Sequence, residues 1–274
     1  MTLISLFGGT GFIGSSYSRL SHNKIDIVDR FDPNPTFSNV LYAIGTTDNY
    51  NIFQNPTLDI ESNLIKLIED LELIRSKFRD FTFNYLSSWF VYGEGSELPL
   101  KESYECRPKG FYSISKYSAE MFIRSYCETH DIKFRIFRLA NVFGDTDRGV
   151  SKKKNALQHL INEIKKGNNI EVYEGGDFVR DYIDIRDVVS ALDIAIESAP
   201  LNSILNIGTG VPSRFIDLLE RAKSDFSSES QFIFIQTPDF HKKVQVRDAY
   251  LDTTTLKSLG FNHRYNILDE ILHL

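Results

Sequence analysis

The sequence has 274 residues, 42% of them hydrophobic and 25% charged, as in an ordinary globular protein with one large core or two unequal lobes. A formal net charge of −6 excludes the generally basic surface of a nucleic-acid-binding protein. Its cysteines, Cys106 and Cys127, and its histidines lack metal-ligand spacing, so we expect no metal site. No apolar run approaches the ~20 residues of a membrane span, and a glycine-rich segment already at residue 8 leaves no room for a signal peptide. We therefore expect a cytoplasmic protein without a membrane partner.

The first predicted element is a buried strand over Leu3–Phe7, followed by a glycine-rich turn and a helix. Gly8 permits a tight turn, Gly11 lets a pyrophosphate approach the backbone, and Gly14 lets helix and strand pack closely. The free N–H groups at the helix start attract phosphate. The alternative is a tight turn that binds nothing. We predict a dinucleotide site that includes Gly8, Gly11, Phe12, Ile13 and Gly14.

A second strand, Ile25–Val28, ends at an acidic residue, Asp29. A carboxylate at this place accepts hydrogen bonds from ribose hydroxyls and repels a 2′-phosphate, which favours NAD. Arg30, the next residue, keeps NADP as the alternative.

Strand and helix signals alternate along the rest of the chain, which predicts an α/β fold with a Rossmann-type, doubly wound parallel sheet. We expect residues 1–145 to form the dinucleotide-binding domain. Residues 146–274 would form mainly a substrate-binding cap, with some segments returning to the sheet. The further predicted strands are 40–45, 81–86, 133–139, 170–173, 204–207 and 232–235, and the helices are 62–77, 112–130, 155–166, 185–198 and 213–224, with two short ones in 253–274.

Tyr112 and Lys116 lie four residues apart at the start of a predicted helix, so they share one face. A nearby ammonium would lower the phenol pKa from about 10 and make Tyr112 a usable base. Ser88, at the end of the preceding strand, could hydrogen-bond the same substrate oxygen. The alternative is an ordinary amphipathic helix start.

These features resemble the extended short-chain dehydrogenase/reductase family, in its NAD-dependent nucleotide-sugar epimerase/dehydratase branch, over nearly the whole chain. The motifs that carry the resemblance are Gly8–Gly14, Asp29, Ser87–Gly93, Tyr112–Lys116, Arg138–Gly144, Arg180–Ile183 and Asn206–Gly210.

The resemblance implies catalytic roles for Ser88, for Tyr112 as the general base, and for Lys116, which would also touch the nicotinamide ribose. It places Gly45 on the strand beside the pyrophosphate, and Asn63 as a support of the site. On the substrate side it implies that Asn141 holds the sugar phosphate, that Arg180 grips the diphosphate with Lys242 as a weaker second candidate, and that Asp187 fixes the fold around Arg180.

Two departures from the family pattern refine the predicted fold and the predicted reaction. The segment between Asp29 and Val40 is too short for the usual helix and strand, so we expect one outer strand to be missing and the adenine end of the cofactor to be exposed. Trp89 and Phe90 stand where dehydratases and decarboxylases have acidic residues, which disfavours both reactions.

The leading hypothesis is a nucleotide-sugar 4-epimerase that works through a transient keto sugar and bound NAD. The runner-up is an NAD(P)H-dependent keto-sugar reductase, and a third hypothesis is a nucleotide sensor without catalysis. The resemblance also implies a homodimer built on the helices 62–77 and 112–130.

Overall fold

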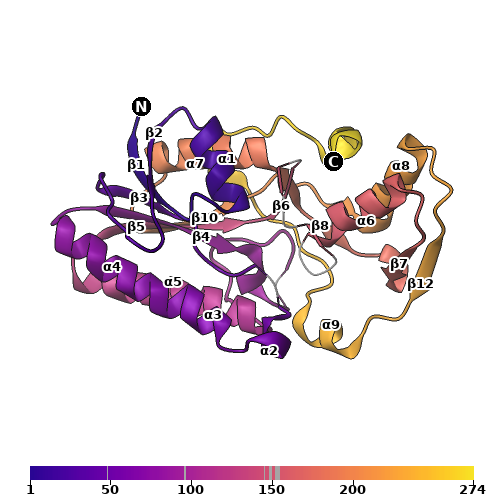
Figure 1. The fold of residues 1–274 in the computed structure, drawn as a ribbon, viewed down its shortest axis with the longest axis horizontal. Helices are drawn as coiled ribbons and strands as arrows, with labels where there is room; N and C mark the ends of the chain where they lie inside the picture. Colours follow the sequence, from indigo (N-terminus) through magenta and orange to yellow (C-terminus); the bar gives the residue numbers. More distant parts are fainter. Residues whose placement is uncertain (48, 96, 145, 148–149, 152–154) are drawn as a thin grey trace.

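The computed structural model describes residues 1–274 except 48, 96, 145, 148–149 and 152–154. Its centre is a parallel six-stranded sheet in the order β10-β5-β4-β3-β1-β2 (Figure 1). The predicted Rossmann-type α/β fold is thereby confirmed. The strands are β1 (Leu3–Phe7), β2 (Lys24–Val28), β3 (Asn39–Tyr42), β4 (Thr82–Ser88), β5 (Lys133–Leu139) and β10 (Ser203–Ile207).

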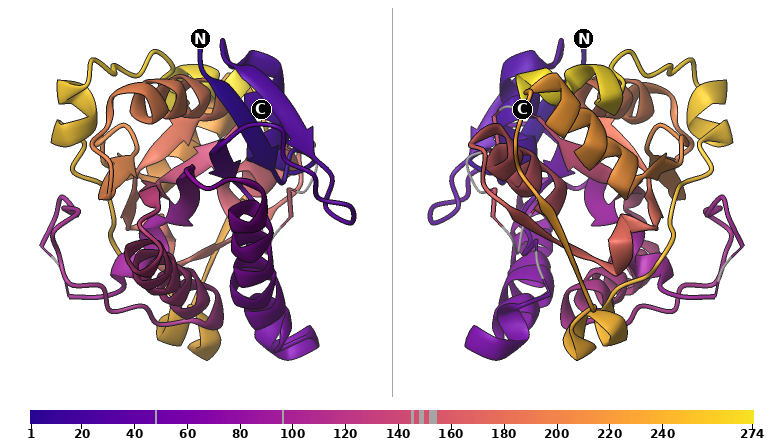
Figure 2. Two further views of the ribbon diagram at one scale, coloured as in Figure 1. Left: turned by 90° about the vertical axis from the view of Figure 1, so that its left-hand side faces the viewer. Right: turned by 90° about the vertical axis from the view of Figure 1, so that its right-hand side faces the viewer.

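Helices cover both faces of this sheet, α1 (Phe12–Leu20) and α7 (Ile185–Ser198) on one side, α4 (Lys66–Lys77) and α5 (Phe111–Thr129) on the other (Figure 1). The end-on views of Figure 2 show α4 and α5 on the same side of the sheet. Successive residues of a strand point to opposite faces, so each face has its own hydrophobic cluster.

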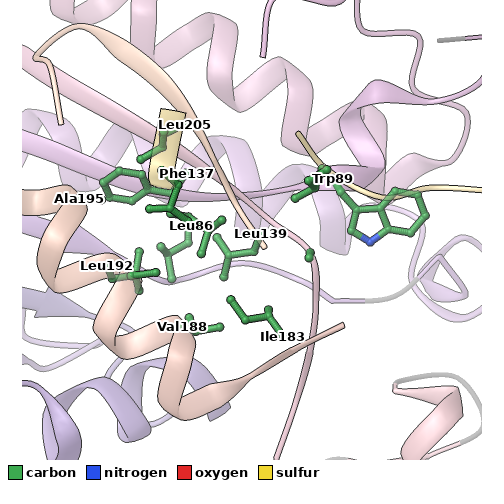
Figure 3. Packing of buried hydrophobic residues seen from close by; sticks show 14 of the residues in the cluster. Leu86, Trp89, Phe137, Leu139, Ile183, Val188, Leu192, Ala195 and Leu205 are labelled. Carbon is green, nitrogen blue, oxygen red and sulfur yellow. The ribbon is translucent and has the colours of Figure 1, made fainter. Parts of the chain in front are cut away.

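Figure 3 shows part of the cluster beneath α7. Val188, Leu192 and Ala195 recur at helical spacing and pack on strand residues of β4, β5 and β10. Asp184 begins the helix by accepting a hydrogen bond from the N–H of Arg186, 2.8 Å away.

The predicted loss of an outer strand is confirmed. Residues 29–38 contain no strand, and within the part of the chain that the structure describes β2 pairs with β1 alone and forms the edge of the sheet. The chain returns from β2 directly to β3, on the other side of β1.

A smaller group of elements lies beyond one end of the strands, on the right of Figure 1. Its helices α6 (Ala156–Lys165) and α8 (Phe215–Asp225) pack together around a third hydrophobic cluster. Short strand pairs complete it: β6 (Asn141–Phe143) with β9 (Tyr182–Asp184), β7 (Ile170–Tyr173) with β12 (Phe232–Ile235), and β8 (Val179–Arg180) with β11 (Ser213–Arg214).

The helix expected over 62–77 is longer and less regular than the sequence indicates. It starts with α3 (Leu58–Ile60), continues as a π-helical turn over Glu61–Ile65 and then becomes α4. The remaining helices are short: α2 (Asn51–Gln54), α9 (Asp239–Val244), α10 (Thr254–Ser258) and α11 (Ile267–Glu270). Within the described residues, no helix has both the length and the apolar content needed to cross a membrane.

Candidate active site

The glycine-rich turn between β1 and α1 depends on backbone contacts that a side chain would prevent. Gly8 has φ +84°, and a Cβ there would lie 2.8 Å from the carbonyl carbon of Ala43. A Cβ on Gly14 would lie 2.2 Å from the Gly8 oxygen. A Cβ on Gly11 would make only an ordinary 3.5 Å contact, so the packing of the protein itself does not require this glycine. Gly11 caps α1 without a side-chain hydrogen bond, and the free N–H groups of a helix start fit a pyrophosphate.

Asp29 lies fully exposed just after β2, where a ribose would be reached from the glycine turn. Its Oδ1 accepts hydrogen bonds from the N–H groups of Phe31 at 2.7 Å and Asp32 at 3.0 Å. These two bonds hold the pKa of Asp29 below its usual value, so the carboxylate is ionised and fixed in a turn. Arg30 is exposed beside it. The glycine turn and Asp29 together fit a dinucleotide.

A cavity of about 610 Å³ opens next to this turn and brings most of the predicted residues together. This volume is typical of a small-molecule site. Gly8, Gly11, Gly14, Asp29 and Arg30 do not line it. Phe12 and Ile13 of α1, Gly45 after β3, Ser88, Tyr112 and Lys116, and the substrate-side candidates Asn141, Arg180 and Lys242 all do.

Lys116 is buried, and its ammonium is held by the sheet rather than by Tyr112. Nζ donates a hydrogen bond to the Leu86 carbonyl oxygen at 2.6 Å and lies 4.2 Å from the centre of the Tyr85 ring. Burial lowers the pKa of Lys116 to about 7, and the negative charge of Glu120 opposes this shift.

Tyr112 is the second residue of α5 and faces the same cavity as Ser88. Burial raises the pKa of its phenol, a hydrogen bond with the Ser88 hydroxyl lowers it, and the charge of Asp59 raises it. The expectation that Lys116 lowers the Tyr112 pKa is therefore wrong for this structure. Desolvation outweighs the other effects, and the ammonium is bonded to the Leu86 carbonyl.

Asn63 lies in the π-helical turn and ties the end of β3 to α5. Its Oδ1 accepts from the Thr46 N–H at 2.9 Å, and its Nδ2 donates to the hydroxyls of Thr46 and Ser115, each at 2.8 Å. A Cβ on Gly45 would lie 2.9 Å from Asn63 Oδ1 and 3.4 Å from Lys116 Nζ, so only glycine fits between them. Sequence reasoning missed Thr46, whose one signal was its position at the end of a predicted strand.

Arg180 is a buried cation that lines the same cavity. Its Nη2 donates to the Val246 carbonyl at 2.6 Å, and its Nη1 donates to the carbonyls of Val179, at 2.9 Å, and Arg247. No carboxylate among the described residues forms an ion pair with it, and burial lowers its pKa to about 10. The negative charge of Asp248 opposes this shift, but the pKa stays lowered, and a buried cation that lacks an ion-pair partner favours an anionic ligand.

Asn141 uses its amide within the protein. Nδ2 donates to the Asp181 carbonyl oxygen at 3.0 Å, and Oδ1 accepts from the Trp89 Nε1–H at 3.3 Å. Lys242 is exposed on α9, 4.0 Å from Asp239. Arg247, an exposed cation that also lines the cavity, was missed because no motif marks it.

The expectation for Asp187 is wrong. Its carboxylate accepts from the N–H groups of Arg264 and Tyr265, which holds the C-terminal segment. Next to Arg180 it is Asp181 that fixes the fold, by accepting bonds from Thr209, Gly210 and Leu251.

Comparisons with known proteins agree with this geometry. The chain is 25% identical, over 98% of its length and 96% of the other protein, to a protein of Methanocaldococcus jannaschii provisionally named UDP-glucose 4-epimerase. Its fold matches UDP-glucose 4-epimerase of Thermotoga maritima, solved with UDP-glucose, with a TM-score of 0.84, 22% identity, and 98% and 96% of the two chains covered. It also matches RMD from Pseudomonas aeruginosa, solved with NADPH, with a TM-score of 0.84, 20% identity, and 99% and 97% covered.

The family model for NAD-dependent epimerases and dehydratases matches residues 37–208, which is more than half of the chain. The chain therefore belongs to the NAD-dependent epimerase/dehydratase family, the family that its sequence motifs resemble.

Proposed function

We propose that this protein is a nucleotide-sugar 4-epimerase that works with bound NAD. One observation carries the proposal: Ser88 and Tyr112 open onto the same cavity as the buried cation of Arg180. A sugar hydroxyl can thus reach the phenol while a diphosphate reaches the guanidinium. The names of the relatives from M. jannaschii and T. maritima support the same reaction.

The proposed cofactor site consists of the glycine turn, Phe12, Ile13, Asp29 and Gly45, with Tyr112 and Lys116 at its nicotinamide end. NAD, when bound there, supplies the hydride acceptor and donor of the reaction. Asp29, ionised and exposed, favours NAD over NADP.

Tyr112 acts as the general base in the proposed mechanism. It removes the proton of the sugar hydroxyl while that carbon becomes a ketone, and it returns the proton when the hydroxyl re-forms with the opposite configuration. Ser88 hydrogen-bonds the same sugar oxygen. Lys116 anchors α5 to β4 through its hydrogen bond to the Leu86 carbonyl, and so holds Tyr112 in place beside Ser88.

The substrate diphosphate would lie against Arg180, with Asn141, Lys242 and the newly found Arg247 around it. A planar guanidinium donates two parallel hydrogen bonds to phosphate oxygens, and it binds most strongly where water is excluded. Arg180 satisfies both conditions, because it is buried and its fork is already oriented by three carbonyls.

A second candidate is a keto-sugar reductase that consumes NAD(P)H. The likeness to the NADPH complex of RMD and the exposed Arg30 beside Asp29 support this reaction. An epimerase shows no net change in reduced nicotinamide during turnover, whereas a reductase consumes it stoichiometrically. The absorbance of the reduced cofactor during turnover distinguishes the epimerase from the reductase. If no sugar is turned over, the nucleotide sensor without catalysis is the hypothesis that remains.

We further propose a cytoplasmic homodimer that pairs through α4 and α5. Two free cysteines suit a reducing compartment. These two helices, which lie on the same side of the sheet, and the π-helical turn before α4 expose apolar side chains, which is typical of a covered surface. These side chains are Ile65, Ile68, Phe111, Ile114, Met121 and Phe122.

We propose that residues 1–145 form the domain that binds the dinucleotide and that residues 146–274 supply most of the contacts with the substrate. The second part is not wholly separate, because β10 is a strand of the main sheet and α7 covers its face.

The deciding experiment is Tyr112→Phe, assayed with a panel of nucleotide sugars. We expect turnover to fall about 10²–10⁴-fold while NAD and nucleoside diphosphate still bind, because the phenol acts only in proton transfer. Full activity of this variant would rule out the mechanism.

A further inference from the structure

Trp89 is the single tryptophan of the chain and stands directly after Ser88, at the start of a 3₁₀ turn over Trp89–Tyr92. It is 3% exposed. Figure 3 shows its indole at one end of the hydrophobic cluster, away from Leu192 and Ala195. At that end it borders the cavity.

The indole touches both groups assigned to the substrate phosphates. Its Nε1–H donates to Asn141 Oδ1 at 3.3 Å, and the Arg180 guanidinium lies over its ring, 5.3 Å from the centroid. Phe178 is the other aromatic ring beside this guanidinium, at 4.7 Å. The cation is therefore bordered by two aromatic rings and tied to backbone carbonyls.

The same indole is also connected to the Tyr112 phenol through the ring of Phe90. Its ring stacks on Phe90 with centroids 4.1 Å apart, and Phe90 meets the Tyr112 ring edge-on at 6.0 Å. A continuous line of packed rings thus runs from the guanidinium of Arg180 to the phenol of Tyr112. Packed aromatic rings keep fixed geometry, so a shift at one end is felt at the other.

We propose that Trp89 is a positioning residue, which sets Asn141 and Arg180 for the substrate diphosphate and fixes their place relative to Tyr112. This rests on the proposed nucleotide-sugar site. The Nε1–H fixes which way the Asn141 amide points: with Oδ1 toward the indole, Nδ2 is directed to the Asp181 carbonyl. The ring face holds Arg180 by a cation–π contact in a desolvated site, where such contacts are strongest.

A fluorescence titration of the wild-type protein tests the first part. Because Trp89 is the only tryptophan, selective excitation reports this one position. We expect UDP, dTDP or GDP, whichever binds most tightly by calorimetry, to change the emission with the same dissociation constant. Unchanged emission at saturation, or no binding of any of the three, would overturn the proposal.

Trp89→Phe tests the positioning role, because phenylalanine keeps an aromatic ring near Arg180 and removes the N–H. We expect affinity for the nucleoside diphosphate to fall about 3–10-fold, the effect of one hydrogen bond. KM for the nucleotide sugar should rise by the same factor, with kcat changed less than about 2-fold. Trp89→Leu, which also removes the ring face, should bind more weakly still.

A double-mutant cycle separates positioning from general damage. If Trp89 acts through Asn141, then Trp89→Phe combined with Asn141→Ala should bind no more than about 2-fold more weakly than Asn141→Ala alone. Fully additive losses, or wild-type affinity in Trp89→Phe, would contradict the proposal. These binding measurements need no turnover, so an inactive protein that still binds and shows the coupling would refute the 4-epimerase function and leave the role of Trp89 standing.

Discussion

Lys116 donates its hydrogen bond to the backbone carbonyl of Leu86, 2.6 Å away, so its ammonium is anchored to strand β4. Leu86 lies two residues before Ser88 on that strand. The bond therefore fixes α5, which carries Tyr112, against the strand that carries Ser88, the proposed catalytic hydroxyl. The cost is a buried amine whose pKa falls to about 7.

Lys116→Met should change how the stability of the protein depends on pH. The pKa of the amine is about 7 in the folded protein and ~10.4 in the unfolded chain, so between these pH values the unfolded chain binds the extra proton. Lys116 therefore makes wild-type stability rise with pH over this window, and the methionine variant lacks that contribution. The test is to measure the melting temperatures of both proteins from pH ~6 to ~9. As pH rises, the melting temperature of the wild type should increase relative to that of the methionine variant. A difference that does not vary with pH would contradict the burial of this amine.

Asp59→Asn should extend activity to lower pH. Asp59 is buried, its Oδ1 accepts from Thr46 and Asn51, and its negative charge raises the pKa of Tyr112. Tyr112 must lose its proton to act as a base, so removing this charge lowers its pKa and moves the acid limb of the kcat/KM profile to lower pH.

The matched control for Asp59 is Glu61→Gln, two residues further along the same helical segment. Glu61 is exposed, so water and salt screen its charge, and we expect the same pH profile as wild type. Equal shifts in both variants would mean that bulk charge, rather than the buried carboxylate, controls the phenol.

Local patterns made much of this site predictable. The glycine turn and the Tyr112–Lys116 pair depend on spacing within one element, and the missing strand followed from the few residues after Asp29. The direction of the Tyr112 pKa was not predictable, because it depends on burial and on where the Lys116 ammonium points. Thr46 and Asp59 reach the site through contacts between distant segments, and no local pattern marks such contacts.

The wrong role predicted for Asp187, which Asp181 fills instead, has the same cause. Both are acidic residues close to Arg180 in sequence, and only the folded chain shows that one meets Thr209 while the other meets Arg264. Closeness to Arg180 in sequence therefore indicated that an aspartate fixes the fold there, but it did not indicate which of the two does so.

Arg138→Met should destabilise the protein strongly, by about 3–5 kcal/mol, because it leaves a buried carboxylate unpaired. Arg138 is 2% exposed and donates to Glu120 Oε2 at 2.7 Å and Oε1 at 3.1 Å. Urea denaturation measures the loss. The double variant Arg138→Met with Glu120→Leu removes both charges and should regain much of the stability. If the double variant is as unstable as the sum of the two single variants, packing rather than charge pairing is the reason.

Phe122→Asp should convert the proposed dimer to monomer. Phe122 is 47% exposed on α5, next to Met121 at 54%, and an aspartate there would carry a charge into an apolar interface. Phe234→Asp is the control, because Phe234 is 62% exposed on β12, in the smaller group of elements, and its replacement should leave the assembly unchanged. Sedimentation velocity at ~10 μM, a concentration that suits interfaces of standard size, compares the sedimentation coefficients of both variants with that of the wild type. A wild-type monomer at this concentration would refute the proposed dimer. A dimer that survives Phe122→Asp would place the interface on another surface.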